Sequence, residues 1–152
     1  MECEKYEKKL FLLELIDYDH YDEIDKEDVE ERYIIGYFSS LKHLEQAISL
    51  CKKRKNANEK METTEFNFEC GNNQKFVYVL FFEYSVLKEN EYADFYEYFA
   101  PQSSYKKCIV QKKNLLNMEK YKDTCNRIFE DSKDGFRIEK IKIDFISHIN
   151  YK

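Results

Sequence analysis

The pattern of apolar and polar positions, in apolar runs and in alternation, predicts six β-strands in this chain of 152 residues. The longest apolar run, Phe76–Leu87, is rich in Val, Tyr and Phe, which favour a buried strand at the centre of a sheet. Apolar and charged residues alternate over Phe136–Phe145, which predicts a half-exposed strand. The other four strands are expected at Lys9–Ile16, Tyr33–Phe38, Thr64–Cys70 and Asp94–Phe99.

Two amphipathic helices are also predicted, each opening after a pair of serines. Ser39 and Ser40 supply an N-cap for the first helix, which ends in the basic run 52–55. Pro101 and the serines 103 and 104 open the second helix, which extends to about Lys120. Gly36 marks a bulge or a close backbone approach within the second strand.

The order of elements repeats along the chain. Both halves contain strand, acidic connection, strand, cap, helix and strand, and Tyr37–Ser40 before the first helix has a counterpart in Tyr98–Ser104. We therefore predict one α+β domain over residues 1–152, built from duplicated ββαβ units at about 9–70 and 75–146. A largely antiparallel sheet of about six strands would carry both helices on one face. The strand order is open, since a turn at 71–73 favours pairing of strands three and four, whereas a 2-1-3 order in each half separates them.

The composition indicates the class of protein and its cellular compartment. An apolar share of 43% and an aromatic share of 16% exclude a disordered chain. Five widely spaced cysteines, without a C-x-x-C pair, indicate free thiols and a cytoplasmic protein. We expect neither a membrane span nor a secretory signal, because the apolar runs are too short and the N-terminus is charged.

Charge is distributed unevenly along the chain. Residues 1–31 contain thirteen Asp and Glu and four Lys, a net charge of −9, so the remaining residues carry +4 of the overall −5. The stretch from Asp17 to Glu31 lacks apolar periodicity and is expected to be a solvated loop or a loose hairpin end. Tyr21 and Tyr33 add the residue type that anchors protein interfaces. The candidate partner-binding surface, called here the acidic surface, comprises Asp17, Asp19, Tyr21, Asp22, Glu23, Asp25, Asp28, Glu31 and Tyr33.

Catalytic, metal and cofactor chemistry has weak support in the sequence. Asp17–Asp28 has an acid at the twelfth position of a calcium loop but Asp22 instead of glycine at the sixth, so no metal is expected. Glu83, Glu97 and Glu139 fit the polar faces of strands, which predicts cross-strand salt bridges instead of acid–base catalysis. No local signature pairs a cysteine with a histidine, and no cofactor is expected. An enzyme without a recognisable motif ranks third among the function classes.

Direct nucleic-acid binding ranks second. The run 52–55 and the pairs Lys106–Lys107 and Lys112–Lys113 would form one basic face if the two helices packed side by side. The overall negative charge disfavours this accessory role.

In size and composition the chain resembles inhibitors carried by phages and mobile elements. Anti-CRISPR proteins, other anti-defence proteins and toxin-neutralising immunity proteins are similarly small, acidic and rich in Lys, Asn, Ile and Tyr. The resemblance includes no motif, so it assigns no residue a role. The leading hypothesis is a non-catalytic protein-binding inhibitor, whose acidic surface occludes a basic surface or nucleic-acid groove of another protein.

Overall fold

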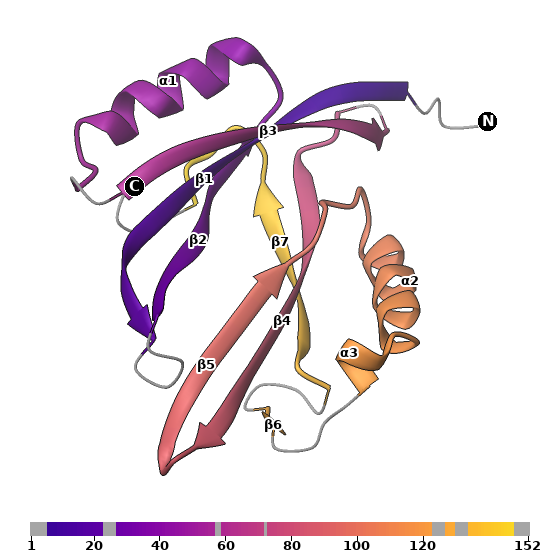
Figure 1. Cartoon of the computed structure of the whole chain (residues 1–152). Coiled ribbons are helices and arrows are strands. Elements are labelled where there is room, and N and C mark those ends of the chain that lie inside the picture. The colour runs from indigo at the N-terminus through magenta and orange to yellow at the C-terminus, as the bar shows by residue number, and fades with distance from the viewer. Residues whose placement is uncertain are drawn as a thin grey trace. The chain divides into compact units, whose positions relative to one another are not determined.

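The computed structural model describes residues 6–22, 27–56, 59–71, 73–122, 127–129 and 134–147. Within these ranges the chain is an α+β protein with seven strands in two antiparallel sheets and three helices (Figure 1). Its contacts divide it into two compact units, one formed by Met1–Phe76 with Ile141–Lys152 and the other by Val77–Lys140. These are called unit 1 and unit 2.

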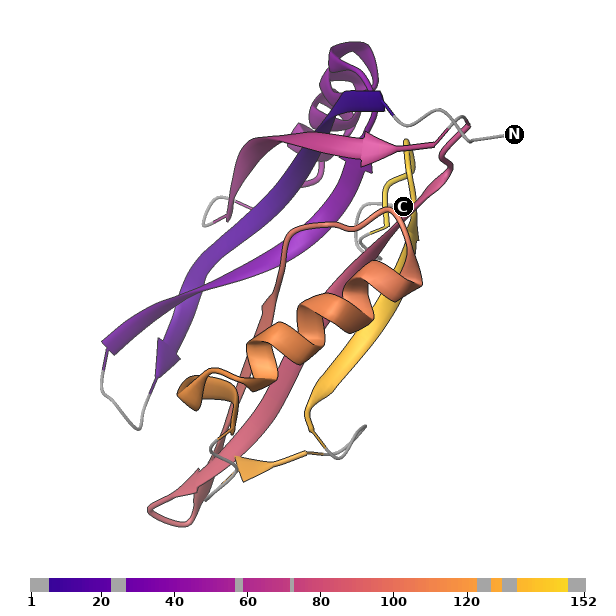
Figure 2. The same cartoon turned by 90° about the vertical axis from the view of Figure 1, so that its right-hand side faces the viewer.

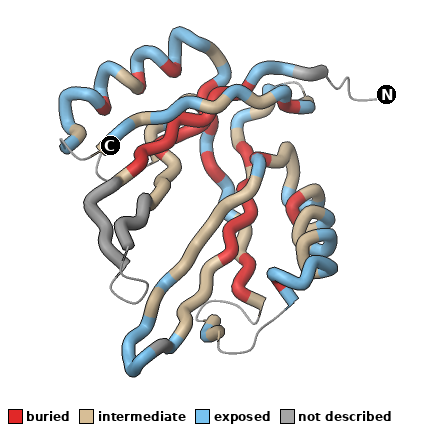
Figure 3. Tube along the Cα trace, in the orientation of Figure 1, coloured by how far each residue is buried: buried red, intermediate tan, exposed pale blue. Residues whose placement is uncertain are grey.

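Unit 1 is built on a three-stranded sheet in the order β2-β1-β3. Its elements are β1 (Tyr6–Asp22), β2 (Glu27–Phe38), α1 (Leu41–Lys52) and β3 (Glu59–Cys70). Leu10 to Ile16 of β1 are buried on both faces of the sheet, as the central position requires (Figure 3). On one face, Leu44, Ala47 and Cys51 of α1 pack with β1 and β2 residues in a common apolar core.

Unit 2 contains a four-stranded sheet in which β4 is central. Its elements are β4 (Phe76–Lys88), β5 (Glu91–Tyr98), α2 (Tyr105–Leu116), α3 (Glu119–Lys122), β6 (Arg127–Ile128) and β7 (Phe136–Lys142), the last two residues of β7 belonging to unit 1. The strand β4 lies between β5 and β6 in the strand order, and it also pairs with β7. Figure 2 shows α2 running along this sheet. Leu115 and Leu116 of α2 pack on an aromatic core around Phe82, whose ring centroid lies 4.6 Å from that of Phe136.

The α+β class and the predicted elements are confirmed, but the single sheet is wrong. The strands form two sheets, and each sheet has its own helix. Strands β3 and β4 lie in different sheets, and the first strand of each unit is central, so the 2-1-3 order is the one adopted by β2-β1-β3. Period-two alternation identifies a strand and its buried face but carries no information about which sheet the strand joins.

Of the two alternatives for the region from Asp17 to Glu31, the described residues form the end of a paired β1–β2 hairpin and not a solvated loop. Strand β1 continues to Asp22 and β2 begins at Glu27, with Asp17 opposite Glu31 and Asp22 opposite Glu27. Pairing with a neighbouring strand thus extends both strands beyond the apolar residues that predicted them. The strand β3 also starts earlier than expected, at Glu59, because it pairs with β1 up to Asp17.

Gly36 and the helix caps behave as predicted. The β1–β2 register shifts between Leu13 and Glu14, opposite Gly36 and Ile34, so a bulge lies beside the glycine. The side chains of Ser40 and Ser104 accept hydrogen bonds from the backbone N–H groups of His43 and Lys107, at 3.2 and 3.3 Å.

The chain segment after β7 completes unit 1. Asp144 and Ser147 donate backbone hydrogen bonds of 2.8 and 2.7 Å to the carbonyl oxygens of Tyr37 and Ile35 in β2. The strand predicted to reach Phe145 therefore ends at Lys142, since Asp144 adopts a φ of 65° that breaks the extended conformation. Between α3 and β7, Arg127–Ile128 forms a short strand that pairs with β4.

Candidate functional site

The strand register of unit 1 places three carboxylates in one row across the sheet. Asp17 on β1 lies opposite Glu31 on β2 and opposite Glu59 on β3. Directly opposed residues on neighbouring strands project from the same face, where like charges are destabilising. This set of Glu31, Asp17 and Glu59 is called the acidic row.

Tyr33 joins the acidic row. Its hydroxyl donates a hydrogen bond to a carboxylate oxygen of Glu31. Partial burial, followed by the charges of Glu31, Asp17 and Glu59, raises the pKa of the Tyr33 phenol well above its ordinary value. The hydroxyl therefore stays protonated, and it presents a donor within a negatively charged environment.

The structure places the other residues of the acidic surface only in part. Asp19, Tyr21, Asp22 and Asp28 are backbone members of the paired β1 and β2 ends, with Tyr21 opposite Asp28. Glu23 and Asp25 lie outside the described residues. Glu59 is not recognisable from the sequence as a neighbour of this surface, because only the β1–β3 register brings it beside Asp17.

A second charged group lies further along the same strands. Arg32 bridges two glutamates, with Nη1 3.6 Å from an oxygen of Glu14 and Nη2 3.2 Å from an oxygen of Glu62. Glu14 is only 6% exposed, and burial together with this carboxylate raises the pKa of the Tyr37 phenol. Arg32 thus keeps a buried charge paired inside the sheet.

The three glutamates considered for catalysis are engaged in structural contacts. Arg137 of β7 lies 2.6 Å from Glu83 of β4 and also contacts Glu139. Glu97 accepts a 2.7 Å hydrogen bond from the Tyr121 hydroxyl and lies 3.2 Å from Lys120. The Arg137–Glu83 pair crosses between strands, as predicted. The other two contacts are not cross-strand pairs, since Glu139 and Arg137 belong to one strand and Glu97 contacts residues of α3.

Two of the cysteines are free, buried thiols. Burial raises the pKa of the Cys108 thiol to about 11 and that of Cys51 above its usual value. At neutral pH such thiols are protonated and weakly nucleophilic. The Cys3 and Cys125 positions, and the Cys70 side chain, lie outside the described part of the chain.

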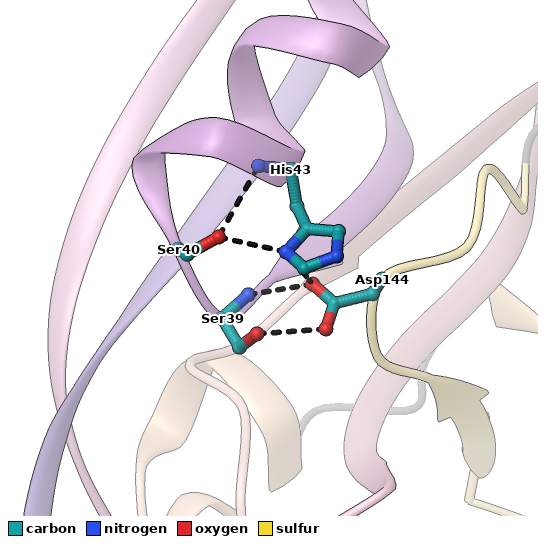
Figure 4. Close-up of polar contacts among 4 residues, drawn as sticks. All are labelled: Ser39, Ser40, His43 and Asp144. Carbon is teal, nitrogen blue, oxygen red and sulfur yellow. Dashed lines mark hydrogen bonds and ion pairs between the residues drawn. The ribbon is translucent and has the colours of Figure 1, made fainter.

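His43 belongs to a polar cluster at the start of α1 (Figure 4). Its Nδ1 atom lies 2.7 Å from the Ser40 hydroxyl and 3.8 Å from a carboxylate oxygen of Asp144. A catalytic triad needs serine and carboxylate on different ring nitrogens, so that the proton crosses the ring. Here both groups face the same nitrogen, and the Ser40 oxygen also caps the helix, which indicates a structural role.

The basic residues of the two helices are separated between the units. Lys52 and Lys53 at the end of α1, and Lys106 and Lys113 on α2, are exposed. Lys112 lies 2.5 Å from Asp134 in an ion pair within unit 2. Because α1 and α2 belong to different units, a single basic face formed by both helices stays a prediction.

Unit 1 also contains a pocket that the sequence analysis missed. Its volume is about 290 Å³, and its lining includes Lys8, Lys9, Lys75 and Lys142. These lysines come from three chain segments, and no spacing in the sequence connects them.

These features define an α+β protein of two units, each with its own antiparallel sheet and long helix. The chain matches no protein-family model, no curated protein and no solved structure. In the described part of the chain, no helix is long and apolar enough to span a membrane. The same residues contain no group of three or more His, Cys, Asp or Glu that would hold a metal ion.

Proposed function

We propose that this protein is a non-catalytic protein-binding inhibitor of the phage or mobile-element type. In this proposal it is an anti-CRISPR or other anti-defence protein, or a toxin-neutralising immunity protein. Its acidic, tyrosine-bearing surface would occupy a basic surface or a nucleic-acid groove of the partner. The observation that carries the proposal is the acidic row of Glu31, Asp17 and Glu59 across three adjacent strands.

The acidic row favours binding over a purely structural role. Like charges that lie directly opposite each other on neighbouring strands destabilise a sheet. Pairing beyond the row continues the pattern, since Asp22 lies opposite Glu27. A basic partner surface would turn this repulsion into attraction and would accelerate association through long-range steering.

Tyr33 gives the surface a candidate anchor. It packs partly against the unit 1 core and directs its hydroxyl towards Glu31, so its ring is held in place before any partner arrives. A rigid, partly apolar side chain loses little conformational entropy on binding.

Neutralising the acidic row tests the proposal. Asp17→Asn, Glu31→Gln and Glu59→Gln together should leave the melting temperature unchanged or raised, because they remove like-charge opposition and retain oxygen acceptors. The matched control changes three exposed glutamates elsewhere, Glu45, Glu91 and Glu119, to Gln. A partner is first captured from an extract of the native host and identified by mass spectrometry. Association rates are then measured at about 50 mM and about 500 mM salt.

We expect the acidic-row variant to bind this partner with a markedly slower on-rate at low salt, and the control variant to bind as the parent does. Equal rates for the parent and the acidic-row variant would contradict the proposal. If nucleic acid is captured instead, and replacing Lys106 and Lys113 by Ala abolishes its binding, the nucleic-acid accessory function is correct.

We further infer that the two units are duplicated ββαβ elements. Both sheets have the first strand of the unit at their centre, and both long helices have twelve residues. Their N-cap serines share one backbone conformation, with φ and ψ of −146° and 158° at Ser40 and −149° and 158° at Ser104. Superposing the units on their central strands tests the inference, and helices that fail to coincide would contradict it.

A further inference from the structure

A pocket of about 290 Å³ lies in unit 1 at the opposite end of β1 from the acidic row. Lys8 and Lys9 line it from the beginning of β1, whereas Asp17 lies eight residues beyond Lys9 on the same strand. At about 3.3 Å per residue, this spacing separates the two features by roughly 26 Å. The pocket is therefore distinct from the surface of the proposed function, and the inference drawn from it does not depend on that function.

Four lysines from three segments of the chain contribute to the lining of this pocket. Lys75 precedes β4, and Lys142 is the last residue of β7, so both join Lys8 and Lys9 only in the folded unit. All four residues are exposed. Lys9 lies 2.8 Å from Glu65, and the Lys142 ammonium lies 4.2 Å from the Phe145 ring centroid, so each of these side chains is held by a neighbour.

Among the described lining residues, the one carboxylate is that of Asp144, which accepts hydrogen bonds from Ser39. Asp144 accepts from the Ser39 backbone N–H at 2.8 Å and from the Ser39 hydroxyl at 2.7 Å, one bond on each oxygen (Figure 4). Its first oxygen also lies 3.8 Å from His43 Nδ1. These contacts hold the Asp144 carboxylate in place. The described lining residues include four lysines and this one carboxylate, so their net charge is positive.

The inner wall of the pocket is apolar. Leu10, Phe68 and Ile143 contribute to the lining and are 2%, 6% and 8% exposed. Asn73 and Gln74 belong to the same lining, and the Gln74 side-chain amide donates a 2.6 Å hydrogen bond to the Phe76 carbonyl oxygen. The lining thus combines cationic residues, a small apolar surface and neutral polar residues.

We propose that this pocket binds a small phosphate ester. A phosphate monoester carries close to two negative charges and three terminal oxygens around a tetrahedral centre, so it can engage ammonium groups approaching from several directions. A carboxylate is planar and is matched best by the fork of an arginine, and the lining formed by the described residues has lysines and no arginine. The volume lies near the lower limit for ligand sites and suits a molecule of mononucleotide or sugar-phosphate size.

The phosphate group has two sources with the same chemistry, a free small ester or the 5′-phosphate at the end of a nucleic-acid strand. Calorimetry with four probes separates them: inorganic pyrophosphate, adenosine monophosphate, and one oligonucleotide with either a 5′-phosphate or a 5′-hydroxyl end. Saturable, salt-sensitive binding of pyrophosphate and the monophosphate supports the free ester. Binding of the phosphorylated oligonucleotide alone supports the strand end.

Two double variants test the lysines themselves. Lys75→Ala with Lys142→Ala removes two cations of the pocket, and Lys106→Ala with Lys113→Ala removes two exposed cations from α2 in unit 2. We expect the first variant to weaken the binding of the preferred phosphate probe by about tenfold or more, and the second to leave it unchanged. All four residues are exposed, so both variants should keep the parent melting temperature.

The absence of saturable binding of every phosphate probe to the parent protein at millimolar concentration would overturn the proposal. Equal affinities for the parent and for the Lys75 and Lys142 variant would also overturn it. In both cases the acidic-row experiment is unaffected, because it uses other residues and a protein partner.

Discussion

The lack of a side chain at Gly36 permits a contact between distant parts of the chain. A Cβ atom at this position would lie 2.5 Å from the carbonyl oxygen of Phe145 and 3.0 Å from the Phe38 ring. The Phe145 oxygen is a backbone atom, so it cannot move aside by a change of side-chain conformation. The absence of a side chain at Gly36 therefore lets residues 144–147 lie along β2.

Replacing Gly36 by Ala should lower the free energy of unfolding by about 1–3 kcal/mol, the usual effect of forcing extra volume into a packed site. Gly71→Ala is the matched control, because a Cβ atom at Gly71 meets nothing within 4 Å. Urea denaturation followed by circular dichroism measures both variants. Equal midpoints for Gly36→Ala and Gly71→Ala would show that residues 144–147 do not press on β2.

The buried side chain of Tyr37 combines an apolar ring with a polar hydroxyl group. It is fully buried, and its hydroxyl has no hydrogen-bond partner among the described residues. A buried polar group in this state opposes folding, and the surrounding apolar contacts offset it. The aromatic ring, and not the hydroxyl, therefore accounts for the stabilising effect of Tyr37.

At the scale of the element, the two long helices begin in the same way. Each has a serine at its N-cap, and neither has an acidic residue in its first turn. The serine oxygen is thus the described side-chain acceptor for the first N–H groups of each helix. This local arrangement explains why the start of both helices is predictable from the sequence.

Ser40→Ala and Ser104→Ala should each lower the free energy of unfolding by about 1 kcal/mol, since each leaves an N-terminal N–H group without its acceptor. Ser40→Gly and Ser104→Gly should cost only a few tenths of a kcal/mol and serve as paired controls. Thermal and urea unfolding provide the measurement. A Ser→Ala variant as stable as the parent protein would show that the cap contributes nothing at that helix.

At the scale of the whole molecule, unit 1 is assembled from both ends of the chain. Residues 1–76 supply the sheet and α1, and residues 141–147 close the unit through backbone hydrogen bonds from Ile143 to Lys75 and from Asp144 to Tyr37, each of 2.8 Å. Unit 1 therefore needs a segment that follows the whole of unit 2 in the sequence.

Truncation after Lys140 removes these hydrogen bonds and the buried side chains of Ile141 and Ile143. We expect a loss of several kcal/mol, enough to unfold unit 1, with increased amide hydrogen exchange throughout β1 and β2. Truncation after Ser147 retains all of these contacts and is the control. Unchanged exchange in β2 after truncation at Lys140 would contradict the role of the C-terminal segment.

The sequence by itself determined the features that depend on neighbours along the chain. Alternation located the strands, 3.6-residue periodicity located the helices, serines located the caps, and Gly36 located a bulge. Each of these patterns is predictive because the interacting groups lie within a few residues of one another, so their spacing can be read directly from the sequence.

Only the tertiary structure decided the features that depend on pairing between distant segments. The division into two sheets, the continuation of β1 and β2 through the acidic residues, and the position of Glu59 beside Asp17 all follow from strand register. The four lysines line one pocket because three segments that are distant in the sequence lie together in the folded unit 1. Register and segment ends are set by the sum of many weak long-range contacts, and no local pattern of residues encodes that sum.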